Sequence, residues 1–239
     1  MNNLAVEKNI IPFMNKEFLK LMAQYECAML EVKTKLEVLK TEMSLENDRN
    51  PFKQISYRLK EPMSIIGKLQ RYGVELSVDS IEKNLHDVAG VRVICPFVDD
   101  IYTLSSKLCS QDDVHVLTRK DYIENPKPNG YRSLHLIVEI PIFLSNEKKF
   151  MQVEVQFRTI AMDFWASLEH KLKYKKNIPS ADAVSARLKA CADEIAAVDM
   201  RMQDVRKQIE WLSEELPEDV KAEREELITS RLLMQMLQN

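Results

Sequence analysis

Hydrophobic residues recur at alternating spacings of four and three in two long segments, one near each end of the chain. The first pattern runs over 18–43 and the second over 184–212. Because residues at i, i+4 and i+7 lie on one side of an α-helix, each segment is predicted to form a long amphipathic helix. The pair Pro179-Ser180 supplies a start for the second helix, and a further helix is predicted to follow Pro217.

Between these helices, short runs rich in β-branched residues alternate with helical stretches. The β-rich runs are 91–95, 114–118, 133–140 and 150–157. Helices are predicted from Glu61-Pro62 to Tyr72, from Asp99 to Cys109 and from Thr159 to Lys173. We therefore expect an α+β or α/β fold with a mixed β-sheet core. One integrated domain is predicted, with an N-terminal helical arm over 1–50, a core over 51–178 and a C-terminal helical arm over 179–239.

The two apolar stripes allow two interpretations. The helices either fold back onto the core of their own chain, or they pair with copies from other chains. A seam of about four heptads is longer than a small core covers easily, which favours some contact between subunits. Packing within one chain stays open as the alternative.

Composition limits the kinds of partner. The chain has 239 residues, 45% of them hydrophobic, enough for one catalytic-sized core. A net charge of −3 argues against a general polyanion-binding protein, so any phosphate site must be local. The four cysteines lack the spacing of a zinc site. The N-terminal residues lack the pattern of a secretory signal and no run is long enough to span a membrane, so a cytoplasmic protein is expected.

The first group with chemical potential is basic. It comprises Arg58, Lys60, Lys68, Arg71 and Arg92. If residues 62–72 are helical, Lys68 and Arg71 share a face, and Arg58 and Lys60 precede that helix. The cations could then converge on a polyphosphate. Simple solvation of exposed Lys and Arg is the alternative.

The second group pairs Asp87 with Glu154. In the run 151–158 the apolar side chains alternate with polar ones, so one strand face is wholly polar and carries Glu154. Two carboxylates beside strands supply hard oxygen ligands for Mg²⁺ and a base for an attacking hydroxyl. A surface strand face with a helix-end Asp is the alternative.

The third group lies in the segment 127–135, KPNGYRSLH. Residues 128–130 form a predicted turn, and Tyr131, Ser133 and His135 then share one strand face at period two. Together with Lys127, the tyrosine and histidine could stack on a base and hold its phosphates. A hairpin whose tyrosine packs on the core is the alternative.

Four segments occur in the order seen in the synthetase domain of the RelA/SpoT alarmone family: YRLKEPMSIIGKL, LHDVAGVRVIC, KPNGYRSLH and VEVQFRTIAMDFWASLEHKLKYK. Over about residues 15–212 the chain resembles the small synthetases of that family, with a layout like that of the RelQ type. The resemblance implies a nucleotidyltransferase-like mixed sheet flanked by helices. It also implies synthesis of (p)ppGpp, the alarmone of the stringent response, by transfer of pyrophosphate from ATP to the 3′-hydroxyl of GDP or GTP with release of AMP.

The resemblance also assigns roles to residues. Arg58, Lys60, Lys68, Arg71 and Arg92 would bind ATP. Asp87 would bind Mg²⁺, and Glu154 would position the ion and take the proton of the 3′-hydroxyl. Tyr131 would stack on guanine, and the other residues of the guanine-nucleotide site would be Lys120, Lys127, His135, Gln156 and Asp163.

Two departures from the family pattern matter. Many relatives have Asn where this chain has Asp163, and an added negative charge there could change the affinity for the acceptor. The segment 50–57, before Arg58, matches poorly the part of RelQ-like proteins that binds their product between subunits. A homotetramer is expected from the resemblance, and single-stranded RNA or an alarmone is a further candidate regulator.

Three other functions are alternatives to (p)ppGpp synthesis. The dipeptide His86-Asp87 resembles part of the hydrolase metal site in larger family members, but the four histidines of the chain all fall within the synthetase-like pattern. A Mg²⁺-dependent nucleotidyltransferase acting on another acceptor would use similar carboxylates and would release pyrophosphate instead of AMP. A helical interaction module or RNA-binding regulator would use the apolar stripes as its functional surface.

Overall fold

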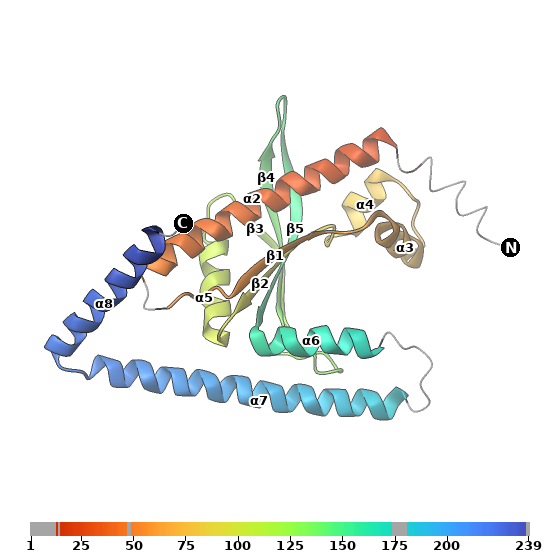
Figure 1. Cartoon of the computed structure of the whole chain (residues 1–239). Coiled ribbons are helices and arrows are strands. Elements are labelled where there is room, and N and C mark those ends of the chain that lie inside the picture. The colour runs from red at the N-terminus through yellow and green to blue at the C-terminus, as the bar shows by residue number, and fades with distance from the viewer. Residues whose placement is uncertain (1–12, 14, 47–48, 174–180, 238–239) are drawn as a thin grey trace.

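Five strands form one mixed sheet in the order β1-β2-β5-β4-β3 in the computed structural model, which describes residues 13, 15–46, 49–173 and 181–237 (Figure 1). The strands are β1 (Gln54–Leu59), β2 (Ala89–Cys95), β3 (His115–Asp121), β4 (Leu134–Phe143) and β5 (Lys148–Thr159). The helices are α2 (Lys16–Glu46), α3 (Pro62–Tyr72), α4 (Val78–Asn84), α5 (Val98–Cys109), α6 (Ile160–Lys173), α7 (Ala181–Glu214) and α8 (Glu218–Leu237). β2 and β5 pair in parallel and the other neighbours are antiparallel. The predicted mixed sheet flanked by helices is confirmed.

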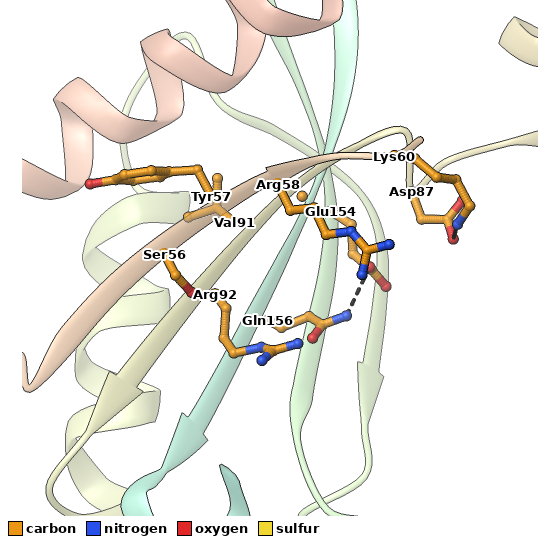
Figure 2. A pocket seen from close by; sticks show the side chains of 10 residues that line it. Ser56, Tyr57, Arg58, Lys60, Asp87, Val91, Arg92, Glu154 and Gln156 are labelled. Atoms are coloured by element: carbon orange, nitrogen blue, oxygen red, sulfur yellow. Dashed lines mark hydrogen bonds and ion pairs between the residues drawn. The ribbon is translucent and has the colours of Figure 1, made fainter. Parts of the chain in front are cut away.

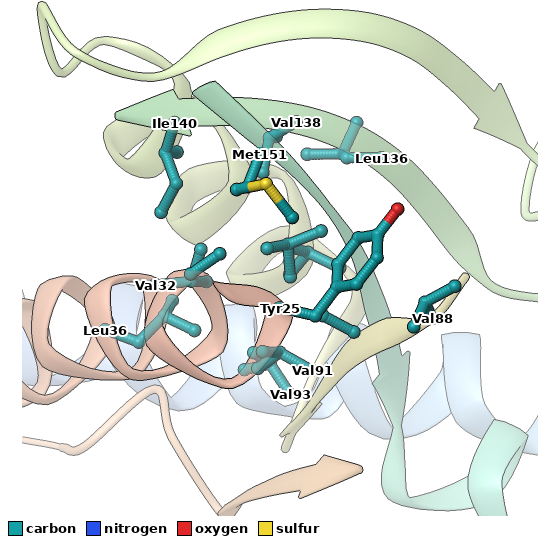
Figure 3. Close-up of a cluster of buried hydrophobic side chains, with 14 of the residues drawn as sticks. Tyr25, Val32, Leu36, Val88, Val91, Val93, Leu136, Val138, Ile140 and Met151 are labelled. Carbon is teal, nitrogen blue, oxygen red and sulfur yellow. The ribbon is translucent and has the colours of Figure 1, made fainter. Parts of the chain in front are cut away.

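Helix α2 covers one face of this sheet. Tyr25, Val32 and Leu36 point from the helix toward the apolar side chains of β2, β4 and β5, such as Val91 and Val138 (Figure 3). Val32 and Leu36 are fully buried. Burying one such side chain contributes about 1.5–3 kcal/mol to folding. The stripe predicted over 18–43 therefore packs within its own chain.

Helix α7 differs from α2, because its apolar stripe is not the side that packs on the core. Its buried positions are small or polar, namely Ala192, Asp199 and Gln203. The carboxylate of Asp199 accepts a hydrogen bond of 2.6 Å from Thr159, at the end of β5. The stripe predicted for this helix is a correct helical pattern, but five of its members lie about half exposed in the single chain: Val198, Met202, Val205, Ile209 and Leu212.

Two short elements were not predicted. β1 pairs antiparallel with β2 and forms one edge of the sheet. α4 spans seven residues and is capped at its N-terminus by Ser77, whose hydroxyl accepts a hydrogen bond from the backbone N–H of Ser80. The predicted start at Pro179-Ser180 lies outside the described residues. Of the helices in the described ranges, none is both long and apolar enough to cross a membrane.

Helix α3 has a defined start and end. Pro62 stands in the first turn of α3, and Gly73 ends the helix with a left-handed backbone, φ +67°. Its N–H donates to the carbonyl of Gln70 at 3.1 Å. This short helix carries Lys68 beside the sheet, where that side chain reaches Asp87.

Candidate active site

The sheet face opposite α2 is polar across all five strands. Residues paired side by side on neighbouring strands point to the same face. The registers Ser56↔Arg92, Arg92↔Gln156, His135↔Gln156 and Lys120↔His135 therefore place one polar residue of each strand in a single row. Four of the five members, all except Ser56, were predicted site residues. The row joins residues that lie far apart in the sequence.

The next row along the same face carries the carboxylate Glu154. Its neighbour on β2 is Gly90, which in turn pairs with Arg58 on β1. Because glycine has no side chain, the floor between Arg58 and Glu154 is open. A cavity of about 370 Å³ occupies this place (Figure 2). Six predicted residues line it: Arg58, Lys60, Asp87, Arg92, Glu154 and Gln156.

Two lysines hold Asp87 at one side of the cavity. The ammonium groups of Lys60 and Lys68 lie 2.6 and 2.8 Å from its two carboxylate oxygens. Burial by itself raises the pKa of Asp87, but the hydrogen bonds and charges of the two lysines outweigh it and lower that pKa below its usual value. Asp87 is therefore ionised at neutral pH and forms ion pairs with Lys60 and Lys68.

Glu154 is held from both sides. Nδ1 of His135 lies 3.2 Å from Oε1 of Glu154, and the amide of Gln156 donates to Oε2 at 2.9 Å. Burial raises the pKa of Glu154, and the contact with His135 opposes it most strongly, so the pKa lies below its usual value. The carboxylate is thus ionised, oriented and able to accept a proton.

A hydrogen-bonded chain continues from His135 to the end of β5. Nε2 of His135 lies 2.8 Å from the hydroxyl of Tyr131, and Arg158 donates to that same hydroxyl at 2.6 Å. Arg158 also donates to Asp163 at 3.0 Å, and Arg92 reaches Asp163 at 3.4 Å. Arg158 was not predicted as a site residue, although its position at period two from Gln156 indicated the same face.

Tyr131 and Lys127 lie close together at the edge of this face. Nζ of Lys127 stands 4.9 Å from the centre of the Tyr131 ring and 4.5 Å from that of Tyr122. Ser133 lies between Tyr131 and His135 in the sequence, but it is fully buried and its hydroxyl donates to the carbonyl of Phe157 at 3.0 Å. The prediction that it shares a face with Tyr131 and His135 stays a prediction.

Two predicted residues, Lys120 and Arg71, are exposed and do not line the cavity. Lys120 is exposed on the edge strand β3, in register with His135. Arg71 is exposed in the last turn of α3, where its Nε donates to the carbonyl of Gly67 at 3.2 Å. Their assigned roles in binding nucleotides stay predictions.

The two carboxylates of the cavity are suitable ligands for Mg²⁺. Asp87 and Glu154 line the same cavity and offer carboxylate oxygens, the ligands that this ion prefers. Within the described ranges no group of three or more His, Cys, Asp or Glu side chains is placed to hold a metal. Mg²⁺ is usually bound by one or two carboxylates together with substrate phosphates and water, so the pair fits a nucleotide-borne ion. His86 instead contacts Gln152, at 2.7 Å.

A mixed sheet with one helix-covered face and one open face of cations and ionised carboxylates suits an enzyme that binds nucleotides and transfers one of their phosphate groups. Residues 57–179 match the family model described as the region found in RelA / SpoT proteins. The chain belongs to the RelA/SpoT family.

Individual relatives agree with this assignment. The chain is 41% identical to GTP pyrophosphokinase YwaC of Bacillus subtilis (strain 168) over 186 residues, 78% of this chain and 89% of that protein. It is 34% identical to GTP pyrophosphokinase YjbM of the same organism, over 82% of this chain and 92% of that protein. Its fold matches small alarmone synthetase 1 from Bacillus subtilis bound to its product pppGpp, with a TM-score of 0.74 and 36% identity over 82% of this chain and 99% of that one.

Proposed function

We propose that this protein is a (p)ppGpp synthetase, which transfers pyrophosphate from ATP to the 3′-hydroxyl of GDP or GTP and releases AMP. The observation that carries the proposal is the polar sheet face, where Arg58, Lys60, Asp87, Arg92 and Glu154 line one cavity. Relatives named GTP pyrophosphokinase and a neighbour bound to pppGpp support it.

The donor nucleotide would bind at the basic side of the cavity. Arg58 on β1 and Arg92 on β2 point into it, and Lys60 lies there beside Asp87 (Figure 2). Lys68 pairs with the same carboxylate. Their charges would neutralise the phosphates of ATP and the negative charge that grows on the bridging oxygen as AMP leaves. Binding ATP requires the lysines to share their contact with Asp87.

The acceptor would bind on the side of Tyr131 and Lys127, with guanine on the tyrosine ring and its phosphates near cations. Glu154 would take the proton of the 3′-hydroxyl as the oxygen attacks the β-phosphorus of ATP. The bond between that phosphorus and the α–β bridging oxygen breaks, and AMP keeps the bridging oxygen. His135 and Gln156 fix the carboxylate, so the base is aligned before the substrates arrive.

Mg²⁺ is part of the proposal. Asp87 and Glu154 would hold it together with the phosphates of ATP. When bound, the ion would supply positive charge to phosphate oxygens during the transfer. Asp87 can play this part because its pKa is already lowered by Lys60 and Lys68.

The direct test incubates the protein with Mg²⁺, ATP and either GDP or GTP and resolves the nucleotides by anion exchange. We expect AMP and a more highly charged guanine nucleotide in equal amounts. Glu154→Gln keeps the size of the side chain but removes the base, and we expect kcat to fall by about 10²–10⁴-fold. Glu139→Gln, on neighbouring strand β4 in register with Gln152, is the matched control.

Each outcome has a clear meaning. Release of pyrophosphate from ATP, with AMP attached to another molecule, would replace the proposal by nucleotidyl transfer. No new guanine species with either acceptor would contradict the proposal and favour the helical or RNA-binding module. Full activity of Glu154→Gln would remove Glu154 from its role as the base.

The proposal also covers the oligomeric state of the protein and the compartment in which it acts. The half-exposed apolar side chains of α7 support contact between subunits, and a homotetramer is the expected assembly. The protein would act in the cytoplasm, where ATP and guanine nucleotides are available. Regulation by single-stranded RNA or by an alarmone stays a prediction.

A further inference from the structure

The loop between β3 and β4 carries both Lys127 and Tyr131. It is folded tightly on itself, since Gly130 donates to the carbonyl of Lys127 at 2.8 Å and Lys127 donates to the carbonyl of Tyr131 at 3.1 Å. Gly130 has φ +88°, a conformation that other residues rarely adopt. The backbone position of Lys127 and Tyr131 therefore depends on what holds Gly130 in place.

Helix α7 holds it. A Cβ atom on Gly130 would lie only 2.5 Å from the Cβ of Ala192 and 3.5 Å from the backbone of Lys189. The loop thus rests directly on one turn of α7, and only glycine allows this approach. Ala192 is 4% exposed and lines a cavity of about 10 Å³ together with Gly130, Met162 and Trp165, so a larger side chain at this position would press on these neighbours.

Arg132 fastens the loop to that turn. It donates to the carbonyl of Gly130 at 3.1 Å, to the carbonyl of Ala192 at 3.4 Å and to the carboxylate of Asp193 at 3.1 Å. One side chain therefore ties the residue before Tyr131 to α7. A planar guanidinium with several fixed donors suits such a three-point link.

The turn of α7 that holds the loop is itself fixed to the core on both sides. The indole of Trp165 donates to the carbonyl of Leu188 at 2.9 Å, and Thr159 donates to Asp199 at 2.6 Å. Farther along, Arg206 reaches Asp99 on α5 at 2.9 Å. The helix is thus anchored to the end of β5 and to α5 and α6, and it can serve as a fixed support.

We propose that Arg132 is a positioning residue, which uses Ala192 and Asp193 of α7 as a support to hold Lys127 and Tyr131 in place for the guanine nucleotide. The inference rests on the proposed function, because it assigns the acceptor to this loop. It makes affinity for the acceptor depend on α7. The donor side is built on other elements, since Lys60 and Lys68 pair with Asp87.

The sharpest test enlarges the support without touching the loop. Ala192→Leu should push Gly130 away and raise the KM for GDP about tenfold, while the KM for ATP changes by no more than about twofold. Ala190→Leu adds the same atoms at an exposed position two residues away and should leave both KM values unchanged. The thermal unfolding midpoint of each variant is measured alongside.

A second pair tests the link through a surface change that leaves the core intact. Asp193→Ala removes one partner of Arg132 and should raise the KM for GDP about threefold. Glu194→Ala, at the next exposed position, should leave the KM for GDP unchanged. Arg132→Ala should have a larger effect, Arg132→Lys should recover part of it, and Asp193→Ala should add little on top of Arg132→Ala.

Equilibrium binding of GDP separates this inference from the proposed function. If the wild-type protein makes no product yet binds GDP, and Ala192→Leu weakens that binding, the proposed function fails and the support role stands. Equal rises of both KM values in Ala192→Leu, or equal behaviour of Ala192→Leu and Ala190→Leu, would overturn the inference. So would unchanged GDP affinity in Arg132→Ala.

Discussion

In the proposed reaction Glu154 would accept a proton, although its surroundings favour the ionised form. Burial works against the charge, whereas His135 and Gln156 support it and lower the pKa of Glu154. A base with a low pKa is weak, but it is ionised at neutral pH. In the proposed reaction, alignment by two hydrogen bonds, together with cations that stabilise the leaving group, would compensate for this weakness.

The contact with His135 has a consequence for the pH dependence of the reaction. Because His135 lowers the pKa of Glu154, His135→Ala should raise that pKa, and the acid side of the profile of kcat/KM against pH should move to higher pH. The rate then falls at a pH where the wild-type protein is still fully active. His115→Ala, which removes an exposed histidine from β3, should leave the acid side in place. An unmoved acid side in His135→Ala would mean that His135 does not support the base.

Asp163 shows why a charge cannot be judged from the sequence alone. The added carboxylate was expected to place a negative charge near the guanine nucleotide. In the structure it lies between two arginines, 3.0 Å from Arg158 and 3.4 Å from Arg92. Its charge is balanced within the protein, and its main contact is to Arg158, which holds Tyr131.

The two long helices have the same kind of apolar pattern but different environments. The pattern tells which residues share a side, and it does not tell what covers that side. For α2 the cover is the sheet of its own chain, and for α7 the core meets the small and polar side instead. β1 was missed although Ile55, Tyr57 and Leu59 alternate with polar residues, whereas α4 is too short to show a period.

Two nearby residues of α2 should contribute very differently to the free energy of unfolding. Leu36 is fully buried and Val38 is 61% exposed. Leu36→Ala should lower the free energy of unfolding by about 2–5 kcal/mol, because it leaves a cavity against the sheet. Val38→Ala should change it by less than about 0.5 kcal/mol. Urea unfolding followed by circular dichroism measures both, and equal effects would mean that α2 does not pack on the sheet as described.

For the whole molecule, the sequence predicted six residues that line the cavity, but not how they come together. The motifs identified Arg58, Asp87, Tyr131 and Glu154 separately. Their assembly depends on the strand order, which places β5 between β2 and β4, and a register cannot be read from a single segment. Arg132 was missed for the same reason, because its partners lie on α7, 60 residues away.

The exposed side of α7 bears on the assembly of the whole protein. Met202 and Ile209 are more than half exposed, on a helix whose other side is docked, and an apolar surface of this kind is typical of an interface. We expect light scattering after size-exclusion chromatography to give the mass of a tetramer. Ile209→Glu would place a charge in the interface and should yield smaller species with unchanged circular dichroism, whereas Gln208→Glu, an exposed polar neighbour, should leave the tetramer intact. A monomeric wild-type protein at micromolar concentration would contradict this assembly, and the apolar side of α7 would then need another cover.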